Sequence, residues 1–167
     1  PVAEAYNSLR GALLYSTPRG LPPVMLVTSA RESEGKTTTS YAIARGVALT
    51  GKKVLLVDAD LRRPSLHRLL GVSGKRGLSS LLTSADPSAS AIVDTGQQGL
   101  SLLPAGPIPP SPTELLSAPR MAAVLEELAE AFDMVVIDSS PVLGLADAPV
   151  LSAIVDGVLL VIEADAA

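Results

Sequence analysis

The chain has 167 residues, of which 47% are hydrophobic and 18% are charged, enough for one well-buried domain and too few for two ordinary ones. It has no cysteine and a single histidine, which excludes disulfide bonds, thiolate metal sites, a cysteine nucleophile and a multi-histidine metal centre. A net charge of −4 and the scarcity of aromatic residues argue against a nucleic-acid-binding surface. We therefore expect one domain over residues 1–167, with His67 on a helix surface and no nucleic-acid partner.

The N-terminal segment has a helical pattern. Val2, Tyr6, Leu9 and Leu13 lie on one stripe, which predicts an amphipathic helix over about residues 2–16. The segment lacks the charged and apolar regions of a signal peptide, and no apolar run in the chain approaches the roughly twenty residues of a membrane-spanning helix.

Five short, continuous apolar runs are typical of strands buried on both faces of a parallel sheet. They occupy residues 24–27, 54–57, 100–103, 134–137 and 158–162. Helical spacing is clearest at Met121, Val124, Leu125, Leu128 and Phe132, with acidic residues on the opposite, solvent-facing side. Strands that alternate with helices predict a layered α/β fold with a mostly parallel central sheet, and the phosphate-binding pattern described below makes the expected fold P-loop NTPase-like, with three layers.

The region over residues 104–119 is rich in proline, a composition that by itself would also fit a linker. Ser111, Pro112, Thr113 and Glu114 have the form of a capping box with proline at the first helical position. We therefore expect an ordered loop that carries a short helix.

A phosphate-binding pattern follows the first predicted strand. Residues 28–38 read TSARESEGKTT, which fits G-x-x-x-x-G-K-[ST] with Ala30 at the first glycine position. In such a loop, backbone N–H groups and the helix N-terminus surround a β-phosphate, Lys36 adds a positive charge, and Thr37 offers a hydroxyl to Mg²⁺. The alternative is a surface turn with a solvated lysine.

Two aspartates stand at the end of the second predicted strand. If the extended conformation persists, Asp58 and Asp60 point the same way. They then need a cation such as Mg²⁺ or Arg62, because their mutual repulsion would otherwise raise a pKa. The alternative is that Asp60 caps the next helix while Arg62 and Arg63 face solvent.

A further aspartate, Asp138, ends the fourth run, where a carboxylate in the manner of Walker B holds Mg²⁺; the alternative is an ordinary loop aspartate. Lys36, Asp58 and Asp138 all follow carboxyl ends of predicted strands, where open parallel sheets bind ligands. Asp147 either faces the same site or caps the helix that Pro149 helps to start.

Several segments that together span nearly the whole chain carry a family resemblance. They are residues 4–10, 34–38, 55–64, 77–79, 103–107, 109–116 and 137–148. The most specific is the Asp-x-Asp-x-Arg element formed by Asp58, Asp60 and Arg62, which separates one group from most P-loop ATPases. In this combination the chain resembles the bacterial protein tyrosine kinases (BY-kinases) attached to capsule and exopolysaccharide co-polymerases.

The resemblance implies an ATP-dependent autokinase that transfers the γ-phosphoryl group to tyrosines of a neighbouring subunit and regulates polysaccharide synthesis and export. The ATP-binding residues that it implies are Glu34, Gly35, Lys36, Thr37 and Thr38. The Mg²⁺ ligands are Thr37, Asp58 and Asp138. The catalytic residues are Lys36, Asp58, Asp60 and Arg62. Either Asp58 or Asp60 would orient the acceptor hydroxyl and take its proton late in the transfer, and the resemblance does not decide between them.

The resemblance also implies partners and a location. Identical subunits would form a ring through Glu4 and Arg10, and a membrane activator or co-polymerase segment would place the domain at the cytoplasmic face of the plasma membrane. Asn7 replaces the middle arginine of the family's E-x-x-R-x-x-R contact motif, which weakens the expected assembly. Ser140 replaces a usual proline, and Glu32-Ser33 stand where the family often has Pro-Gly or Gly-Gly. The family's further C-terminal strand, helix and tyrosine-rich tail are missing from this sequence.

Two alternative functions remain. One is an ATPase switch like MinD and ParA, which carry a signature lysine where this chain has Arg31. The other is a regulatory subunit that binds nucleotide without turnover, suggested by Ser33, Asn7 and the missing tail.

Overall fold

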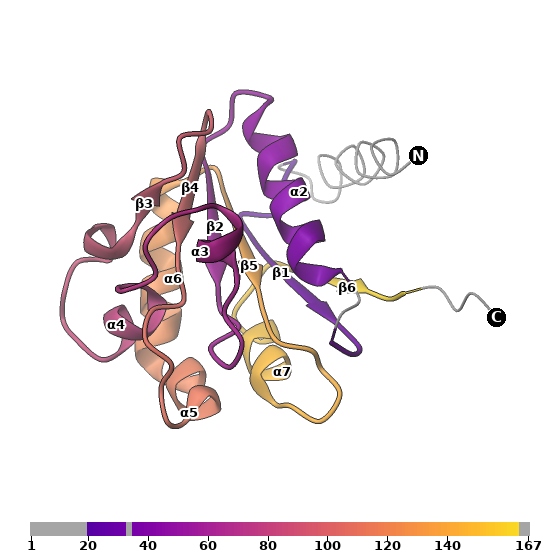
Figure 1. Cartoon of the computed structure of the whole chain (residues 1–167), viewed down its shortest axis with the longest axis vertical. Coiled ribbons are helices and arrows are strands. Elements are labelled where there is room, and N and C mark those ends of the chain that lie inside the picture. Colours follow the sequence, from indigo (N-terminus) through magenta and orange to yellow (C-terminus); the bar gives the residue numbers. More distant parts are fainter. Residues whose placement is uncertain (1–19, 33–34, 164–167) are drawn as a thin grey trace.

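The structure is a computed structural model that describes residues 20–32 and 35–163. In this part of the chain a six-stranded sheet has the order β3-β4-β2-β5-β1-β6 (Figure 1). Its strands are β1 (Val24–Ser29), β2 (Val54–Asp58), β3 (Val93–Asp94), β4 (Leu100–Leu103), β5 (Met134–Asp138) and β6 (Gly157–Val161). Neighbouring strands are parallel except β3, which runs antiparallel to β4. The prediction of a mostly parallel sheet is confirmed.

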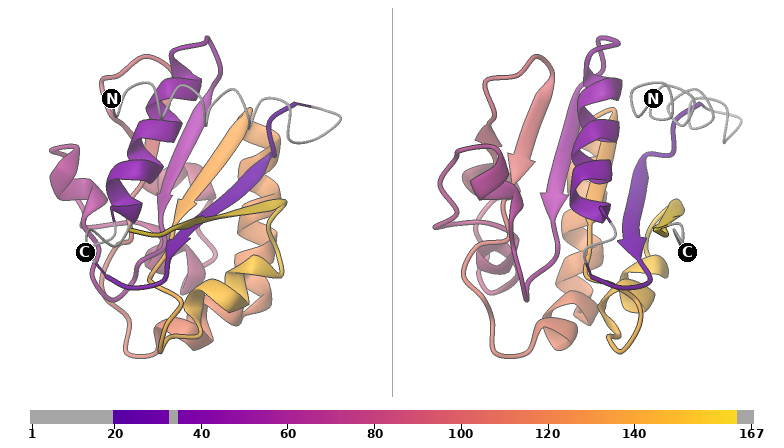
Figure 2. Two further views of the ribbon diagram at one scale, coloured as in Figure 1. Left: turned by 90° about the vertical axis from the view of Figure 1, so that its right-hand side faces the viewer. Right: turned by 45° about the vertical axis from the view of Figure 1, so that its right-hand side comes forward.

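Helices cover both faces of the sheet, and Figure 2 shows α2 (purple) and α6 (salmon) on opposite sides of it. One face carries α2 (Lys36–Ala48) and α3 (Leu66–Leu69). The other face carries α4 (Leu78–Leu82), the 3-10 helix η1 (Ser88–Ala91), α5 (Pro112–Ser117), α6 (Pro119–Ala131) and α7 (Asp147–Ser152). The three layers predicted from the sequence are therefore present.

Alternate residues of the central strands enter opposite core layers. In β1, Val24 and Leu26 pack on the α6 side, whereas Met25 and Val27 pack on the α2 side. A strand covered on both faces buries every side chain, which explains the apolar run over residues 24–27. The polar Thr28 and Ser29 at its carboxyl end are buried as well, and their hydroxyls donate hydrogen bonds to backbone carbonyl oxygens.

Strand β6 lies at the edge of the sheet and departs from this rule. Its side chains alternate between half-buried and exposed, and Val158 and Leu160 are 52% and 47% exposed. The expectation of two-sided burial is therefore wrong for this run among the described residues. The sequence also did not predict β3, because its two residues are too few to show a period.

Helix α6 confirms the helical spacing, since Met121, Val124, Leu125 and Leu128 are all buried. Its acidic residues face solvent as predicted. The short helix in the proline-rich region is also present as α5, but Ser111 makes no side-chain capping hydrogen bond. The predicted capping box is wrong in that respect.

The proline-rich loop is held against α4. The backbone N–H groups of Leu78 and Ser79 donate to the carbonyl oxygens of Pro104 and Ala105 at 2.7 and 2.9 Å. A Cβ atom at Gly77 would lie 2.1 Å from the Pro104 oxygen, so this close approach requires glycine. The segment is an ordered loop and not a linker.

The register of the sheet brings the carboxyl ends of three strands together. Asp138 of β5 lies opposite Asp58 of β2 on one side and Val27 of β1 on the other. Residues that follow these strands therefore meet at the carboxyl-terminal end of the sheet. None of the helices within the described ranges combines the length and apolarity that a bilayer span requires.

Candidate active site

The phosphate-binding loop connects β1 to α2. Gly35 precedes α2 with φ +82°, a left-handed conformation that favours glycine, and its carbonyl oxygen accepts the first helical hydrogen bond, from Thr39 N–H at 2.9 Å. The backbone N–H groups at the start of α2 thus become available to an anion. Glu34, which the resemblance assigned to ATP binding, lies outside the described residues, as do Glu4, Asn7, Arg10 and the predicted N-terminal helix.

Asp138 is the centre of a buried polar cluster with the start of α2. Thr37 Oγ1 donates to its Oδ2 at 2.9 Å, and Ser40 Oγ donates to its Oδ1 at 3.1 Å. Lys36 Nζ lies 3.4 Å from Oδ1. Burial raises the pKa of Asp138, and the charge of Lys36 and the hydroxyl hydrogen bonds oppose this rise. Ser40 was missed from the sequence, although its place four residues after Lys36, on the same face of α2, was a usable signal.

Asp60 faces the same lysine from the opposite wall of the site. Its Oδ2 lies 3.2 Å from Lys36 Nζ, while its Oδ1 accepts the backbone N–H groups of Arg62 and Arg63 at 3.3 and 3.0 Å. These two turn hydrogen bonds fix the carboxylate in its direction toward Lys36. The cation beside Asp60 is therefore Lys36, together with a distant contribution from Arg62.

Asp58 is held differently. Its Oδ1 accepts the Asp60 N–H, and its Oδ2 accepts the N–H groups of Ser65 and Leu66, each at 3.1 Å. The expected shared direction of the two aspartates is not observed, because β2 ends at Asp58 and the extended geometry does not continue. Asp58, and not Asp60, supports the start of α3. Burial, and next the charge of Asp138, raise the pKa of Asp58 to about 7.

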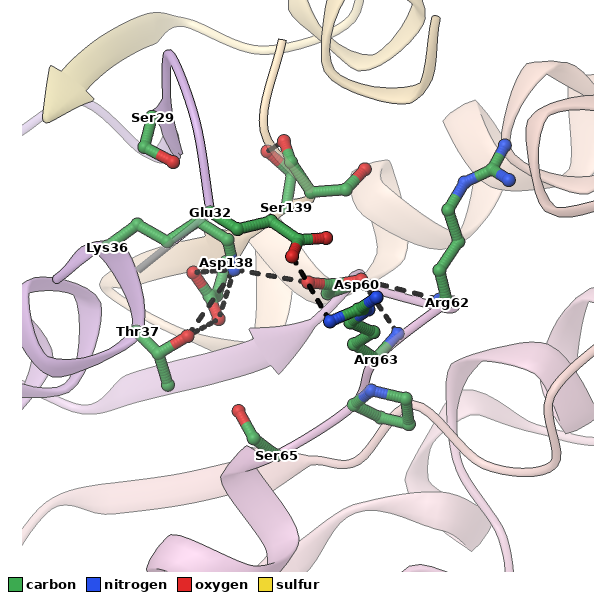
Figure 3. Close-up of polar contacts among 12 residues, drawn as sticks. Ser29, Glu32, Lys36, Thr37, Asp60, Arg62, Arg63, Ser65, Asp138 and Ser139 are labelled. Atoms are coloured by element: carbon green, nitrogen blue, oxygen red, sulfur yellow. Dashed lines mark hydrogen bonds and ion pairs between the residues drawn. The ribbon is translucent and has the colours of Figure 1, made fainter. Parts of the chain in front are cut away.

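The Arg62 side chain belongs to a separate hydrogen-bond network, directed away from Lys36. Its Nε and Nη2 donate to Asp147 at 2.9 and 3.2 Å, and Nη2 also donates to Thr113 Oγ1 at 3.1 Å. Thr113 and Ser140 donate their hydroxyls to the same Asp147 carboxylate. In Figure 3 the Arg62 side chain points away from Lys36 and Asp138.

Asp147 therefore does neither of the two things considered from the sequence. It pairs with Arg62 and is fully buried, and the start of α7 has no side-chain cap. Burial by itself would raise the pKa of Asp147, but hydrogen bonds from Arg62 and Thr113 hold that pKa below its usual value.

A cavity of about 300 Å³ opens between the phosphate loop and the segment after β2. Its lining residues are Glu32, Gly35, Lys36, Thr37, Thr38, Asp60, Arg63, Ser65 and Pro141. It thus combines a helix N-terminus, two cations and hard oxygen donors, a set suited to phosphate and Mg²⁺. His67 is not part of the lining; its ring is so close to Gly74 that a Cβ atom there would lie 2.7 Å from it.

The fold and the loop between β1 and α2 define the class of protein, an α/β domain of the P-loop type. The family model described as an AAA domain matches residues 26–167. Tyrosine-protein kinase YwqD of Bacillus subtilis is 38% identical over 161 residues, which cover 96% of this chain and 68% of the relative. Tyrosine-protein kinase Etk of Escherichia coli is 36% identical over 95% of this chain but only 22% of its own length.

Solved structures agree with this relationship. The kinase domain of E. coli tyrosine kinase ETK superposes with a TM-score of 0.90 at 36% identity, covering 95% of this chain and 62% of that one. The cell-division ATPase MinD of Pyrococcus furiosus gives 0.71 at 27% identity, covering 83% and 58%. The chain belongs to the bacterial protein tyrosine kinase family, and the resemblance inferred from the sequence is confirmed in preference to the MinD-like alternative.

Proposed function

We propose that this domain binds ATP with Mg²⁺ and transfers the γ-phosphoryl group to tyrosine hydroxyls of a neighbouring subunit, as part of capsule or exopolysaccharide synthesis. The main support is the cavity, in which Lys36 of the phosphate loop and Asp60 of the opposite wall lie 3.2 Å apart. This arrangement places a phosphate-binding cation and a proton-accepting carboxylate within reach of one bound substrate.

The start of α2 and Lys36 would hold the phosphates. Lys36 is 11% exposed in its side chain and already contacts Asp60 and Asp138. A phosphate oxygen would replace one of these carboxylates as the partner of Lys36. Because the lysine side chain is already largely buried, this exchange would cost little further desolvation. Thr38 lines the same wall and would add a hydroxyl donor.

Thr37 and Asp138 fit Mg²⁺ best. Their oxygens lie 2.9 Å apart, and hydroxyl and carboxylate oxygens are the ligands that this hard cation prefers. A metal held by these two residues would supply positive charge to balance the negative charge of the phosphates. Asp58 lies opposite Asp138 in the sheet register, and its carboxylate oxygens already accept three backbone hydrogen bonds, so it would support this pair without holding the metal directly.

This geometry favours Asp60 over Asp58 for the acceptor. The tyrosine oxygen forms a bond to the γ-phosphorus while the bond to the β,γ-bridging oxygen breaks, and ADP leaves with the electron pair. Asp60 would accept the phenol proton late, because carboxylates are much weaker bases than phenolates and do not remove a phenol proton before transfer has advanced. The Lys36 Nζ, 3.2 Å from Asp60 Oδ2, would help to hold this carboxylate in position.

Arg62 has a positioning role in this proposal. Its pairing with buried Asp147 fixes the turn that follows Asp60, whose Oδ1 accepts the Arg62 N–H. Relatives such as Etk are much longer than the matched part, which supports a membrane activator as a fused or separate partner. A ring of identical subunits through Glu4 and Arg10, at the cytoplasmic face of the membrane, remains part of the proposal.

Mass spectrometry of the full-length protein incubated with MgATP tests the function. We expect mass gain on tyrosine in the parent, none in Lys36→Met, and a loss of at least about hundredfold in rate for Asp60→Asn, since general-base catalysis contributes about 10²–10⁴-fold. ADP formation without phosphotyrosine would favour the ATPase switch instead. Binding with neither product would favour a regulatory subunit.

A further inference from the structure

The two neighbouring arginines after Asp60 have opposite environments. Arg62 makes two hydrogen bonds to a fully buried carboxylate and one to Thr113. Arg63 instead lines the cavity, where its Nη1 pairs with Glu32 Oε2 at 3.1 Å. Figure 3 shows Glu32 reaching from the phosphate loop to Arg63 across the site.

The Glu32–Arg63 pair is weakly held. The Arg63 and Glu32 side chains are 76% and 54% exposed, and exposed ion pairs contribute little because water and salt screen them. Arg62 would have to leave a buried aspartate unpaired in order to move, which is costly. Arg63 is therefore the arginine that an incoming anion can recruit.

The charges of the cavity support this assignment. Among the described residues, its lining contains two cations, Lys36 and Arg63, and two anions, Glu32 and Asp60. In the Glu32–Arg63 pair the charge of the second cation is already partly balanced. A phosphate carries more charge than a carboxylate and accepts two parallel hydrogen bonds from a guanidinium. The γ-phosphate of ATP therefore competes well with Glu32 for Arg63.

We propose that Arg63 is the residue that binds the γ-phosphate, and that Glu32 holds it at the mouth of the site until ATP arrives. The inference rests on the proposed function, because it takes ATP as the ligand of this cavity. Arg63 touches substrate and stabilises the charge on the transferring group, whereas Arg62 only positions the Asp60 turn. Glu32 sets the threshold for nucleotide binding through a contact that ATP must break.

The test compares the affinities of a non-hydrolysable ATP analogue and of ADP, both with Mg²⁺, by calorimetry on the full-length protein. Arg63→Ala should weaken binding of the analogue about tenfold, the value of one charge-assisted contact, and change ADP binding less than about twofold. Glu32→Gln should strengthen analogue binding about two- to threefold, since it releases a surface ion pair. Arg63→Lys should retain part of the preference, because it keeps the charge and loses the planar fork.

Arg76→Ala is the matched control. Arg76 pairs with Asp86 at 2.9 Å, and both side chains are 50% exposed, so this variant also removes a surface ion pair but lies outside the phosphate cavity. It should leave both affinities unchanged. An equal loss for analogue and ADP in Arg63→Ala, or no loss for either, would overturn the assignment.

The outcomes separate this inference from the kinase proposal. If the parent labels tyrosine and Arg63→Ala keeps its preference for the analogue over ADP, only the inference fails. If no tyrosine is labelled but the preference depends on Arg63, the inference stands and the kinase proposal fails. A parent that binds neither nucleotide would overturn both.

Discussion

Replacing Asp58 with asparagine should make the metal-free and nucleotide-free protein more stable at pH 8, although the substitution removes a hydrogen-bonded group from the core. The carboxyl group of Asp58 is fully buried and lies opposite Asp138 in the sheet register. Its pKa rises from 3.8 to about 7 for these two reasons. Between these pH values the folded protein retains a proton that the unfolded chain has lost, so the free energy of unfolding falls as pH rises from about 4 to about 7.

The magnitude follows from the pKa values and the contacts. Each pKa unit corresponds to about 1.4 kcal/mol, so the rise from 3.8 to about 7 corresponds to about 4 kcal/mol of stability lost by pH 8. Asparagine avoids this loss, but its one carbonyl oxygen cannot accept all three backbone N–H groups that Asp58 binds. One unsatisfied donor costs about 1–3 kcal/mol. The expected net gain at pH 8 is therefore about 1–3 kcal/mol.

Thermal unfolding in EDTA at pH 5 and pH 8 measures the effect. A gain of about 2 kcal/mol raises the Tm by about 4–8 °C in a domain of this size, and at pH 5, where Asp58 is protonated, the difference should nearly vanish. Asp147→Asn is the matched control, because Asp147 is equally buried but its pKa is lowered by Arg62. It should lose at least about 2 kcal/mol at pH 8. If Asp58→Asn is less stable than the parent at pH 8, or keeps the parent's pH dependence, the reasoning is wrong.

Two further predictions concern the proposed metal site and the core. Thr37→Val removes the hydroxyl that lies 2.9 Å from Asp138 and keeps the shape of the side chain. We expect Mg²⁺ to tighten ADP binding about tenfold in the parent, and the variant should lose most of this effect in calorimetry with and without EDTA. The Tm of the variant should stay within a few degrees of the parent's. Leu56→Ala truncates a fully buried side chain of β2 and should lower the free energy of unfolding, measured by urea denaturation, by about 2–5 kcal/mol. Val158→Thr, at a half-exposed site on β6, should change it by less than about 0.5 kcal/mol.

The fold was largely predictable because its signals are local. Strands covered on both faces appear in the sequence as unbroken apolar runs. The Gly35-Lys36-Thr37 sequence marks the turn into α2, because glycine followed by lysine and threonine is the end of the phosphate-loop pattern. The edge strands were harder to predict from sequence. β3 has two residues, and β6 has the same apolar composition as a central strand although one side of it is exposed.

The different contacts of the charged residues could not be predicted, because they join segments that are distant in the sequence. Asp58 and Asp60 are two residues apart and alike in sequence, yet one accepts the N–H groups that open α3 and the other faces Lys36. Arg62 turns away from the cavity because Asp147, 85 positions later, is placed beside it by α5 and α7. Only the three-dimensional structure therefore distinguishes Arg62 from Arg63.

Burial of the aspartates links the stability of the fold to the proposed ligands. Among the described residues, Lys36 is the cation in contact with Asp60 and Asp138, and Asp58 lies opposite Asp138 in the sheet register, so three carboxyl groups are buried near one lysine. Folding has already removed these carboxylates from water, and a divalent cation that enters meets their charge at low dielectric with little screening. Under the proposed function, Mg²⁺ bound with ATP would offset the repulsion between these carboxylates, and binding to the native state in this way would stabilise it. Nucleotide binding and stability would then be coupled through one set of side chains, and Asp58 would contribute to both without lining the cavity.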